Sequence, residues 1–280
     1  MKFALATAAD THQCAYDEDA LIVAALKARG AEARTVIWDQ TDPASLAGQT
    51  VVIRTPWDYQ AKFPEFMAWL KVLPEAGATL INAPEIIFGT IDKTYLADYA
   101  ARGFAIPETK VVNSQQELTD ALQNPVFADA ILKPCVGAGA IGLVHIAAAD
   151  KTCWQTIPID APQLLQRFLP EIETTGEMSF VFFNGDYSHT VRKLPKAGDI
   201  RVQSEWGGSV EVAKPDDGLI QQAAHFLTAL PSVPTYARVD VVDVDGQLLL
   251  MELEVIEPEL FCLHVDSAAD RFAEALLSAA

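Results

Sequence analysis

The chain has 280 residues, half of them hydrophobic, and a formal net charge of −18. This acidic balance argues against a nucleic-acid or anionic-membrane partner, because no cluster of Lys or Arg offsets it. No apolar run approaches the ~18–20 residues of a membrane span, and the four cysteines lie far apart without metal-type spacing. We therefore expect a cytoplasmic α/β protein with reduced thiols.

The first 82 residues alternate between strand and helix patterns. Strand patterns occur at residues 2–7, 33–38, 50–54 and 78–82, and helical periodicity occurs at residues 18–29 and 63–73. This alternation predicts a small parallel α/β unit. The loops after its strands, including residues 8–16 and 54–59, are expected to share the edge where such sheets bind ligands.

The loop after the third strand carries side chains suited to a small substrate. We expect Arg54, Trp57, Asp58 and Tyr59 to face a ligand there. Composition alone supports equally well a Trp57 that fills the core and an Arg54 in a surface ion pair.

Two lysines in the next part of the chain are candidate phosphate ligands. Lys93 lies in the first turn of a helix predicted at residues 92–102, where a cation opposes the helix dipole unless it binds an anion. Lys133 lies on a strand, at residues 130–133, that leads into a glycine-rich loop. An ordinary surface lysine is the alternative for each of them.

The loop Gly137-Ala138-Gly139-Ala140-Ile141-Gly142 matches G-x-G-x-x-G, so a dinucleotide-binding fold is one interpretation. That fingerprint needs a helix directly after the third glycine, whereas residues 143–146 have a strand pattern. A loop between two strands is instead typical of a flap whose backbone N–H groups cover phosphates. We therefore prefer the flap and keep an NAD(P)-dependent oxidoreductase as an alternative.

Basic residues also occur in two later segments. Arg192 and Lys193 end the second strand of a hairpin predicted around Asn184-Gly185. Because successive strand residues point to opposite faces, at most one of the pair faces a given site. The polar segment at residues 198–208 contains Arg201 and resembles a substrate loop, with a plain surface connection as the alternative.

A second hairpin, at residues 236–259, combines acidic side chains with an apolar face. Taking Val244-Asp245-Gly246 as a three-residue loop pairs Asp243 with Gln247. One face then carries Arg238, Asp240, Leu250, Glu252 and Glu254. The opposite face is an apolar stripe made of Val239, Val241, Leu249, Met251, Leu253 and Val255.

Carboxylates packed this closely repel one another and favour protonation unless a cation lies among them. Mg²⁺ takes oxygen ligands and commonly arrives with a nucleotide phosphate. We therefore predict Asp240, Glu252 and Glu254 as metal ligands, with a solvated acidic strand as the alternative. The sequence lacks Walker, kinase and Ser-His-Asp signatures, which leaves phosphoryl transfer from ATP as the chemistry.

The order of these parts resembles the ATP-grasp superfamily, particularly its glutathione synthetase-like and D-cycloserine ligase-like (O-ureido-serine cyclo-ligase) members. The resemblance covers the whole chain. Its motifs are Asp92-Lys93, Leu132-Lys133-Pro134 with the glycine loop, residues 166–171 with Gly176-Glu177, Arg238-Val239-Asp240 and Glu252-Leu253-Glu254. It implies an α/β (α+β) fold with an N-terminal parallel α/β domain (residues 1–90), a small lid domain (91–164) and a larger C-terminal ATP-binding domain with an antiparallel sheet (165–280).

The resemblance also implies how a nucleotide and its metal ions are held. Lys93 and Lys133 would contact the ATP phosphates, and the glycine loop would close over them through Gly137, Ala138, Gly139, Ala140 and Gly142. Adenine would bind the backbone of the hinge formed by Gln166, Arg167, Phe168 and Leu169, and the ribose would bind Glu177. Two Mg²⁺ ions, or Mn²⁺, would be held by Asp240, Glu252 and Glu254. The family usually has asparagine at the position of Glu254, so this chain adds a negative charge there.

The remaining implied roles concern catalysis and the substrate. Arg238 or Arg192 would stabilise the transferring phosphoryl group, and Arg201 is a third candidate cation. The Trp57-Asp58-Tyr59 loop and the segment around Arg201 resemble the cycloserine-type branch. Arg54 and Arg201 would therefore bind a substrate carboxylate bidentately.

The implied reaction is phosphorylation by ATP of a carboxylate or carbonyl oxygen on a small amino-acid-like substrate. An amine-type nucleophile then attacks the activated carbon, and ADP and phosphate are released. Catalysis would come from positioning and charge neutralisation. Intermolecular ligation and cyclisation both stay open, a homodimer is expected from the resemblance only, and a non-catalytic Mg-ATP-binding protein is a further alternative.

Overall fold

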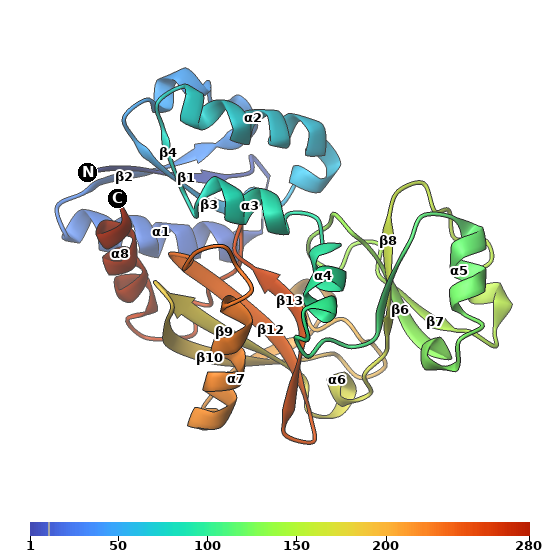
Figure 1. Cartoon of the computed structure of the whole chain (residues 1–280). Coiled ribbons are helices and arrows are strands. Elements are labelled where there is room, and N and C mark those ends of the chain that lie inside the picture. Colours follow the sequence, from blue (N-terminus) through green and yellow to red (C-terminus); the bar gives the residue numbers. More distant parts are fainter. Residues whose placement is uncertain (11) are drawn as a thin grey trace.

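A computed structural model describes residues 1–10 and 12–280, and in the first helix it leaves the side chains of Gln13, Cys14 and Tyr16 undescribed. The loop predicted at residues 8–16 therefore lies partly outside the described residues. The described chain forms three sheets (Figure 1), one of them parallel and two antiparallel. This arrangement confirms the predicted α/β (α+β) class. None of the described helices is both long enough and apolar enough to span a bilayer.

The N-terminal domain is built on a parallel four-stranded sheet in the order β2-β1-β3-β4. Its elements are β1 (Lys2–Thr7), α1 (Gln13–Ala28), β2 (Glu32–Ile37), β3 (Thr50–Thr55), α2 (Phe63–Glu75) and β4 (Thr79–Ile81). Alternate residues of β1 pack to opposite sides: Ala4 and Ala6 join the cluster that contains Phe66 of α2, and Leu5 joins the cluster that contains Phe272 of α8 (Ala268–Ala279). Because both faces of the sheet are covered, nearly all side chains of the central strands β1 and β3 are buried, whereas the edge strand β2 has exposed polar residues.

The middle part of the chain, which the resemblance assigns to a lid domain, forms an antiparallel sheet in the order β5-β8-β6-β7, with α5 packed on it. Its elements are α4 (Tyr95–Ala101), β5 (Thr109–Val112), α5 (Gln115–Ala121), β6 (Asp129–Pro134), β7 (Val144–Ala147) and β8 (Gln163–Arg167). The glycine-rich loop runs from β6 into β7, which is a strand and not a helix, so the dinucleotide-binding alternative is wrong. The domain boundary predicted after residue 164 falls inside β8, because that strand pairs with β5 and β6.

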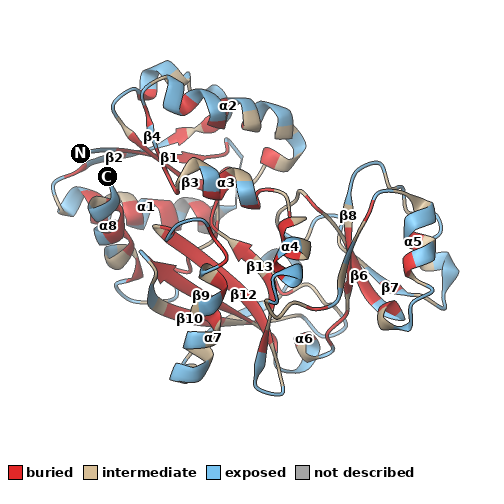
Figure 2. Cartoon of the chain, in the orientation of Figure 1, coloured by how far each residue is buried: buried red, intermediate tan, exposed pale blue. Residues whose placement is uncertain are grey.

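The C-terminal domain contains an antiparallel sheet in the order β11-β10-β9-β12-β13. The strands are β9 (Glu177–Phe183), β10 (Asp186–Leu194), β11 (Ser209–Ala213), β12 (Tyr236–Val244) and β13 (Gln247–Glu254), and the flanking helices are α3 (Pro84–Thr90), α6 (Glu171–Thr174), α7 (Asp217–Leu227) and α8. Figure 2 shows that this sheet is buried along most of its length. The predicted turn at Asn184-Gly185 is confirmed, and both residues have positive φ (50° and 82°).

The hairpin of β12 and β13 differs from its predicted register in one respect. Its turn is a two-residue loop, so Asp243 pairs with Leu248 and not with Gln247. A bulge between Asp240 and Val241 then skips one residue of β13. As a result Leu250 lies in the apolar core and Met251 lines the cavity described below, the reverse of the prediction.

The bulge also restores the predicted faces at the far end of the hairpin. Asp240 lies opposite Glu252, and Arg238 lies opposite Glu254. These four side chains therefore stay on one face even though the turn was predicted incorrectly.

Asn82, directly after β4, joins the N-terminal domain to this hairpin. Its side-chain Nδ2 donates to the carbonyls of Tyr236 and Val255, each at 2.8 Å, and its Oδ1 accepts from the amide of Thr235 at 2.6 Å. The end of β4 is consequently held against the start of β12 and the residue that follows β13.

Candidate active site

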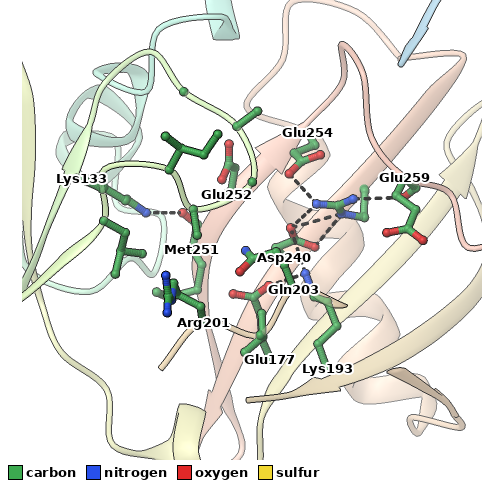
Figure 3. A pocket seen from close by; sticks show the side chains of 18 of the residues that line it. Lys133, Glu177, Lys193, Arg201, Gln203, Asp240, Met251, Glu252, Glu254 and Glu259 are labelled. Carbon is green, nitrogen blue, oxygen red and sulfur yellow. Dashed lines mark hydrogen bonds and ion pairs between the residues drawn. The ribbon is translucent and has the colours of Figure 1, made fainter. Parts of the chain in front are cut away.

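A cavity of about 510 Å³ is lined by residues of all three domains. In Figure 3, Lys133 reaches into it from one side, Glu254 and Glu259 lie on the other, and Asp240, Glu177 and Lys193 lie between. The volume is in the range of small-molecule and cofactor sites. Basic, acidic and apolar side chains all line the cavity, and its regions differ in polarity and charge.

The lid end of the cavity is mainly apolar. Ile131, Phe168, Ile172 and Met251 line it. Gln166 is almost fully buried there: its Nε2 donates to Thr109 Oγ1 at 2.9 Å, whereas its Oε1 has no partner among the described residues. A flat apolar slot with one unsatisfied acceptor suits a base that carries an amino group.

Lys133 lies at the boundary between this slot and the charged centre. Its Nζ donates to the Met251 carbonyl at 3.4 Å, and burial lowers the pKa of its ammonium group. Because a buried cation with only a weak neutral partner is costly, an anion entering the cavity would stabilise it.

Lys93 also lines the cavity, and its side chain contacts the glycine loop. Its Nζ donates to the Gly137 carbonyl at 2.5 Å and lies 3.0 Å from Glu252 Oε1. Burial alone would lower the pKa of Lys93, but Glu252 and the carboxylates near it outweigh burial and raise it. Lys93 is therefore a fully charged group held between the lid and β13.

The centre of the cavity is a network of buried ion pairs. Asp240 accepts from Arg238 Nε (3.0 Å) and Nη2 (2.9 Å) and from Ser179 Oγ (2.5 Å). Lys193 Nζ lies 2.5 Å from Glu177 and 3.5 Å from Asp240. Burial opposes ionisation of Asp240, but Arg238 and Lys193 prevail and lower its pKa to about 2. Asp240 is thus a permanent carboxylate.

Glu254 is in a different electrostatic state from Asp240. It accepts a short hydrogen bond from Arg238 Nη2. Burial, together with the neighbouring carboxylates of Glu252 and Asp240, outweighs that arginine and raises the pKa of Glu254 to about 8. A cation placed beside Glu252 and Glu254 would relieve this repulsion.

The three carboxylates predicted to bind a metal do not form a preorganised cluster. Among the described residues no group of three or more acidic, histidine or cysteine side chains is arranged to hold an ion. Each of the three is instead drawn to a basic side chain, as the distances above show. Their oxygen donors nevertheless fit Mg²⁺, which is usually bound by one or two carboxylates together with substrate phosphates and not by an all-protein cage.

The third region of the cavity faces the N-terminal domain. Trp57 Nε1 donates to the Glu257 carbonyl at 3.0 Å, and both Trp57 and Tyr59 line the wall. A hydrogen bond links the Tyr59 hydroxyl to the Glu257 carboxylate, although burial still raises the pKa of Glu257. Glu259 lines the same wall, and burial raises its pKa to about 7.

A segment from the C-terminal domain completes this wall. Arg201 makes a bidentate pair with Asp199 (2.9 and 2.6 Å), and its guanidinium carbon lies 3.7 Å from the centre of the Trp206 ring. Trp206 Nε1 donates to the Gly139 carbonyl at 3.0 Å. Arg201 therefore lines the cavity with a carboxylate partner already in place, and Trp206 connects this segment to the glycine loop.

Several residues predicted to act in the site lie outside the cavity lining. Arg54 has no exposed surface and pairs with Glu18 and Asp19 (2.6 and 3.3 Å), so it cannot bind a substrate where it lies; this prediction is corrected. Asp58 accepts from Trp38 and Lys62. Arg192 points to the exposed face, towards Glu211.

Three predicted nucleotide residues also lie outside the lining. Arg167 pairs with Glu108, Leu169 is buried in a small apolar cluster, and Gly142 is packed against Pro134. The predicted site residues that do line the cavity are Lys93, Lys133, Gly137, Ala138, Gly139, Ala140, Gln166, Phe168, Glu177, Arg201, Arg238, Asp240, Glu252, Glu254, Trp57 and Tyr59.

Sequence reasoning missed Lys193, Glu257 and Glu259. Lys193 was recognised only as half of a pair with Arg192, and the choice between them depends on which face of β10 is turned towards β12. Glu257 and Glu259 lie just beyond β13 in the same acidic stretch as Glu252 and Glu254, which was the available signal.

Two family models match the chain, one for each part. Residues 3–82 match the model described as D-cycloserine synthetase DcsG, N-terminal domain, and residues 92–263 match the model described as prokaryotic glutathione synthetase, ATP-grasp domain. The second match alone covers more than half of the chain. Along the chain, the match to an N-terminal domain is thus followed by the match to an ATP-grasp domain.

Individual relatives agree with these models. The cycloserine biosynthesis protein DcsG of Streptomyces lavendulae is 27% identical over 248 residues, covering 81% of this chain and 82% of the relative. A glutathione synthetase of Brucella melitensis is 24% identical over 48% of this chain and 43% of its own length. The crystal structure of D-cycloserine synthetase DcsG superposes with a TM-score of 0.87 at 25% identity, over 100% of this chain and 99% of that one.

A more distant structure supports the fold alone. A D-alanine–D-alanine ligase from Bacillus anthracis matches with a TM-score of 0.68 at 15% identity. The fold expected from the sequence is confirmed by these neighbours.

Proposed function

The chain belongs to the prokaryotic glutathione synthetase ATP-grasp family and is therefore an ATP-dependent ligase, and we propose that it is a Mg²⁺-dependent cyclo-ligase acting on a small amino-acid-like substrate. It would phosphorylate a carboxylate or carbonyl oxygen, and an amine-type nitrogen of the same molecule would then attack the activated carbon. Support for the cyclising form comes from the cycloserine-type relative, which matches across both domains.

The observation that carries the proposal is the arrangement of cations and carboxylates in one cavity. Lys93 and Lys133 both line it, and Glu252 lies within 3.0 Å of Lys93. Two lysines suit the phosphates of a nucleotide, and the carboxylates suit the cation that accompanies it.

We assign the lid end to the nucleotide base. The slot lined by Ile131, Phe168 and Met251 would hold a purine, and Gln166 Oε1 would accept from its amino group. Glu177 faces the next part of the cavity, where a ribose would follow the base. The glycine loop, joined to Trp206 through Gly139, would cover the phosphates and exclude water.

Glu252 and Glu254 are the residues best placed to hold Mg²⁺, with Asp240 supporting them through Arg238. The ion, when bound, supplies charge neutralisation for the phosphates. Arg238 is fixed by Asp240 and Glu254 and by the Glu259 carbonyl at 3.1 Å, so its guanidinium is held rigidly at the centre of the cavity. Rigid positive charge of this kind stabilises a transferring phosphoryl group without reorganisation.

The chemical steps conserve atoms and electrons in a simple way. A substrate oxygen attacks the γ-phosphorus of ATP, the bond from that phosphorus to the bridging oxygen breaks, and ADP leaves with the electron pair. The nitrogen lone pair then attacks the activated carbon, the carbon–oxygen bond breaks, and phosphate departs with the former substrate oxygen. The nitrogen loses its proton in the same stage.

The N-terminal wall suits a substrate that bears a cationic group. Glu257 and Glu259 face the cavity, and none of the ion pairs within the described chain includes either carboxylate. A bound ammonium group would offset the burial that raises their pKa values. Trp57 and Tyr59 would pack against the rest of the molecule.

The proposal is tested by Mg²⁺-dependent ADP release across a panel of amino acids, dipeptides and O-ureido-serine, with a control that lacks substrate. We expect one strong responder, whose product is smaller than the substrate by the mass of water or of another small leaving group. A product that joins two separate molecules would replace cyclisation with intermolecular ligation. Binding of NAD(P) with no effect of Mg²⁺ would contradict the proposal altogether.

A further inference from the structure

Residues 257–262, which follow β13 and are here named the strap, are held in place by side chains from several other elements. Four successive carbonyls each accept one side-chain hydrogen bond. The donors are Trp57 Nε1 to Glu257 (3.0 Å), Arg54 Nη1 to Pro258 (2.9 Å), Arg238 Nη1 to Glu259 (3.1 Å) and His189 Nε2 to Leu260 (2.8 Å). A segment without regular structure thus has four of its backbone carbonyls paired with side-chain donors.

Glu18 of α1 fixes the amides of the same strap. Its Oε1 accepts from the Cys262 amide at 2.7 Å, and its Oε2 accepts from the Leu260 amide at 3.1 Å. Oε2 also accepts from Arg54 Nη2 at 2.6 Å. One carboxylate therefore connects two strap amides to the arginine that holds the Pro258 carbonyl.

This pair is completely removed from solvent, since Glu18 is 2% exposed and Arg54 is 0% exposed. A buried ion pair is weak evidence for stability, because well-packed apolar residues often stabilise a fold equally well. What the pair provides that apolar residues cannot is a fixed position for backbone N–H and C=O groups. The strap is also the segment that brings Glu257 and Glu259 to the cavity.

We propose that Glu18 and Arg54 are positioning residues, which set the location of Glu257 and Glu259 from the N-terminal domain. Neither touches the cavity, and both act through the strap. The functional part of this inference rests on the proposed function, in which the strap forms the substrate wall. It gives Arg54 a role in the reaction different from the substrate-binding role expected from the sequence.

The test compares Glu18→Gln with a matched control, Asp19→Asn. Both changes replace a buried carboxylate by an amide of the same size, in the same cluster and beside the same arginine. The hydrogen bonds of the Asp19 side chain in the described structure go to Arg54 and Thr55, and none goes to the strap. In Glu18→Gln, in contrast, a side-chain NH₂ group replaces one of the two oxygens that accept from the Leu260 and Cys262 amides. That NH₂ group would face a backbone N–H donor.

The first readout needs no substrate. Hydrogen exchange is measured on the peptide that contains the Leu260 and Cys262 amides. We expect Glu18→Gln to exchange about tenfold faster than the wild-type protein, and Asp19→Asn to stay within about threefold of it. Equal acceleration in the two variants would overturn the inference, because the cluster would then serve only general stability.

The second readout uses the compound that responds in the ADP-release panel. We expect Glu18→Gln to raise the KM for that compound about tenfold while the KM for ATP stays within about twofold. Parallel increases in both constants, or an unchanged substrate KM, would overturn the inference. If every compound is silent, cyclo-ligation fails as a proposal, and the exchange experiment still decides whether Glu18 holds the strap.

Arg54→Lys serves as a second variant if Glu18→Gln does not fold. Lysine keeps a positive charge near Glu18 and Asp19 but lacks the forked guanidinium group that also donates to the Pro258 carbonyl. We expect the peptide that contains the Leu260 and Cys262 amides to exchange hydrogen faster in this variant than in the wild-type protein, as in Glu18→Gln. Exchange that is unchanged in a folded Arg54→Lys protein would overturn the inference.

Discussion

Lys93 Nζ lies 3.0 Å from Glu252 Oε1 and donates at 2.5 Å to the Gly137 carbonyl, so one ammonium group connects β13 to the glycine loop. The residues proposed to bind phosphate and metal are thus paired with each other. Entry of Mg-ATP would exchange these partners: the lysine would turn to phosphate and the carboxylate to the ion. Each of the two side chains has a partner of opposite charge before and after the exchange, which keeps the buried charges compensated.

Replacing Glu252 tests whether its carboxylate binds the metal ion. We expect Glu252→Gln to reduce Mg²⁺-dependent ADP release at least about a hundredfold, because the amide cannot neutralise the cation. The far-ultraviolet circular dichroism spectrum should be unchanged. The control is Glu211→Gln on β11, an exposed residue beside Arg192 outside the cavity. Similar losses in both variants would contradict the assignment.

Replacing Lys133 tests whether this lysine binds the phosphates of ATP. We expect Lys133→Met to weaken ATP binding about tenfold to a hundredfold, which is the range for the loss of one charge-assisted hydrogen bond. Calorimetry with a non-hydrolysable ATP analogue measures it without turnover. Lys110→Met is the matched control, because Lys110 is exposed on β5 of the same sheet. An affinity unaffected by Lys133→Met would place the phosphates elsewhere.

We expect Glu254 to make the proposed metal binding dependent on pH. Its raised pKa, about 8, means that the carboxyl must lose a proton before it can hold a cation. Mg²⁺-dependent ATP affinity should therefore rise about eightfold from pH 7 to pH 8.5. Glu254→Asn, which restores the residue usual in the family, should flatten this dependence. The same slope in both proteins would exclude Glu254 as the titrating group.

His189 makes stability depend on pH in a predictable direction. Burial lowers the pKa of its ring to about 4, below the usual 6.5, although the hydrogen bond from the ring to the Leu260 carbonyl opposes this shift. Between pH 6.5 and 4 the unfolded chain binds more protons than the folded protein, so stability decreases as pH falls through that range. His189 accounts for at most about 3 kcal/mol of this loss.

The measurement is urea unfolding at pH 7.5 and pH 5 for the wild-type protein and for His189→Gln. Glutamine can still donate to the carbonyl but does not titrate. We expect the difference in free energy of unfolding between the two pH values to be smaller in the variant. An identical difference would show that other groups cause the pH dependence.

Local signals were sufficient for most of the fold. Alternating strands and helices predicted the parallel sheet, and Asn184-Gly185 predicted a hairpin, because these patterns report on neighbouring residues alone. The bulge beside Val241 could not be predicted, since it arises where β12 must pair with β9 and β13 at once. It moved Met251 into the cavity and Leu250 out of it.

The site was predictable where it follows from strand alternation and not where it depends on distant partners. The alternation of side chains along a strand predicts that Asp240, Glu252 and Glu254 lie on one face. Arg54, however, is buried by Glu18, which lies 36 residues away in the sequence, so its burial depends on how α1 packs against β3. The choice of Lys193 over Arg192 depends in the same way on the orientation of β10.

The most direct test of the central claim follows an oxygen atom. The substrate found in the ADP-release panel is labelled with ¹⁸O at its carboxylate or carbonyl oxygen, and the phosphate from a single turnover is analysed by mass spectrometry. If that oxygen is phosphorylated and later displaced by nitrogen, each phosphate carries one ¹⁸O, and this is the result we expect. Unlabelled phosphate would show that ATP is cleaved without activating that substrate oxygen, and would contradict the proposed ligase mechanism.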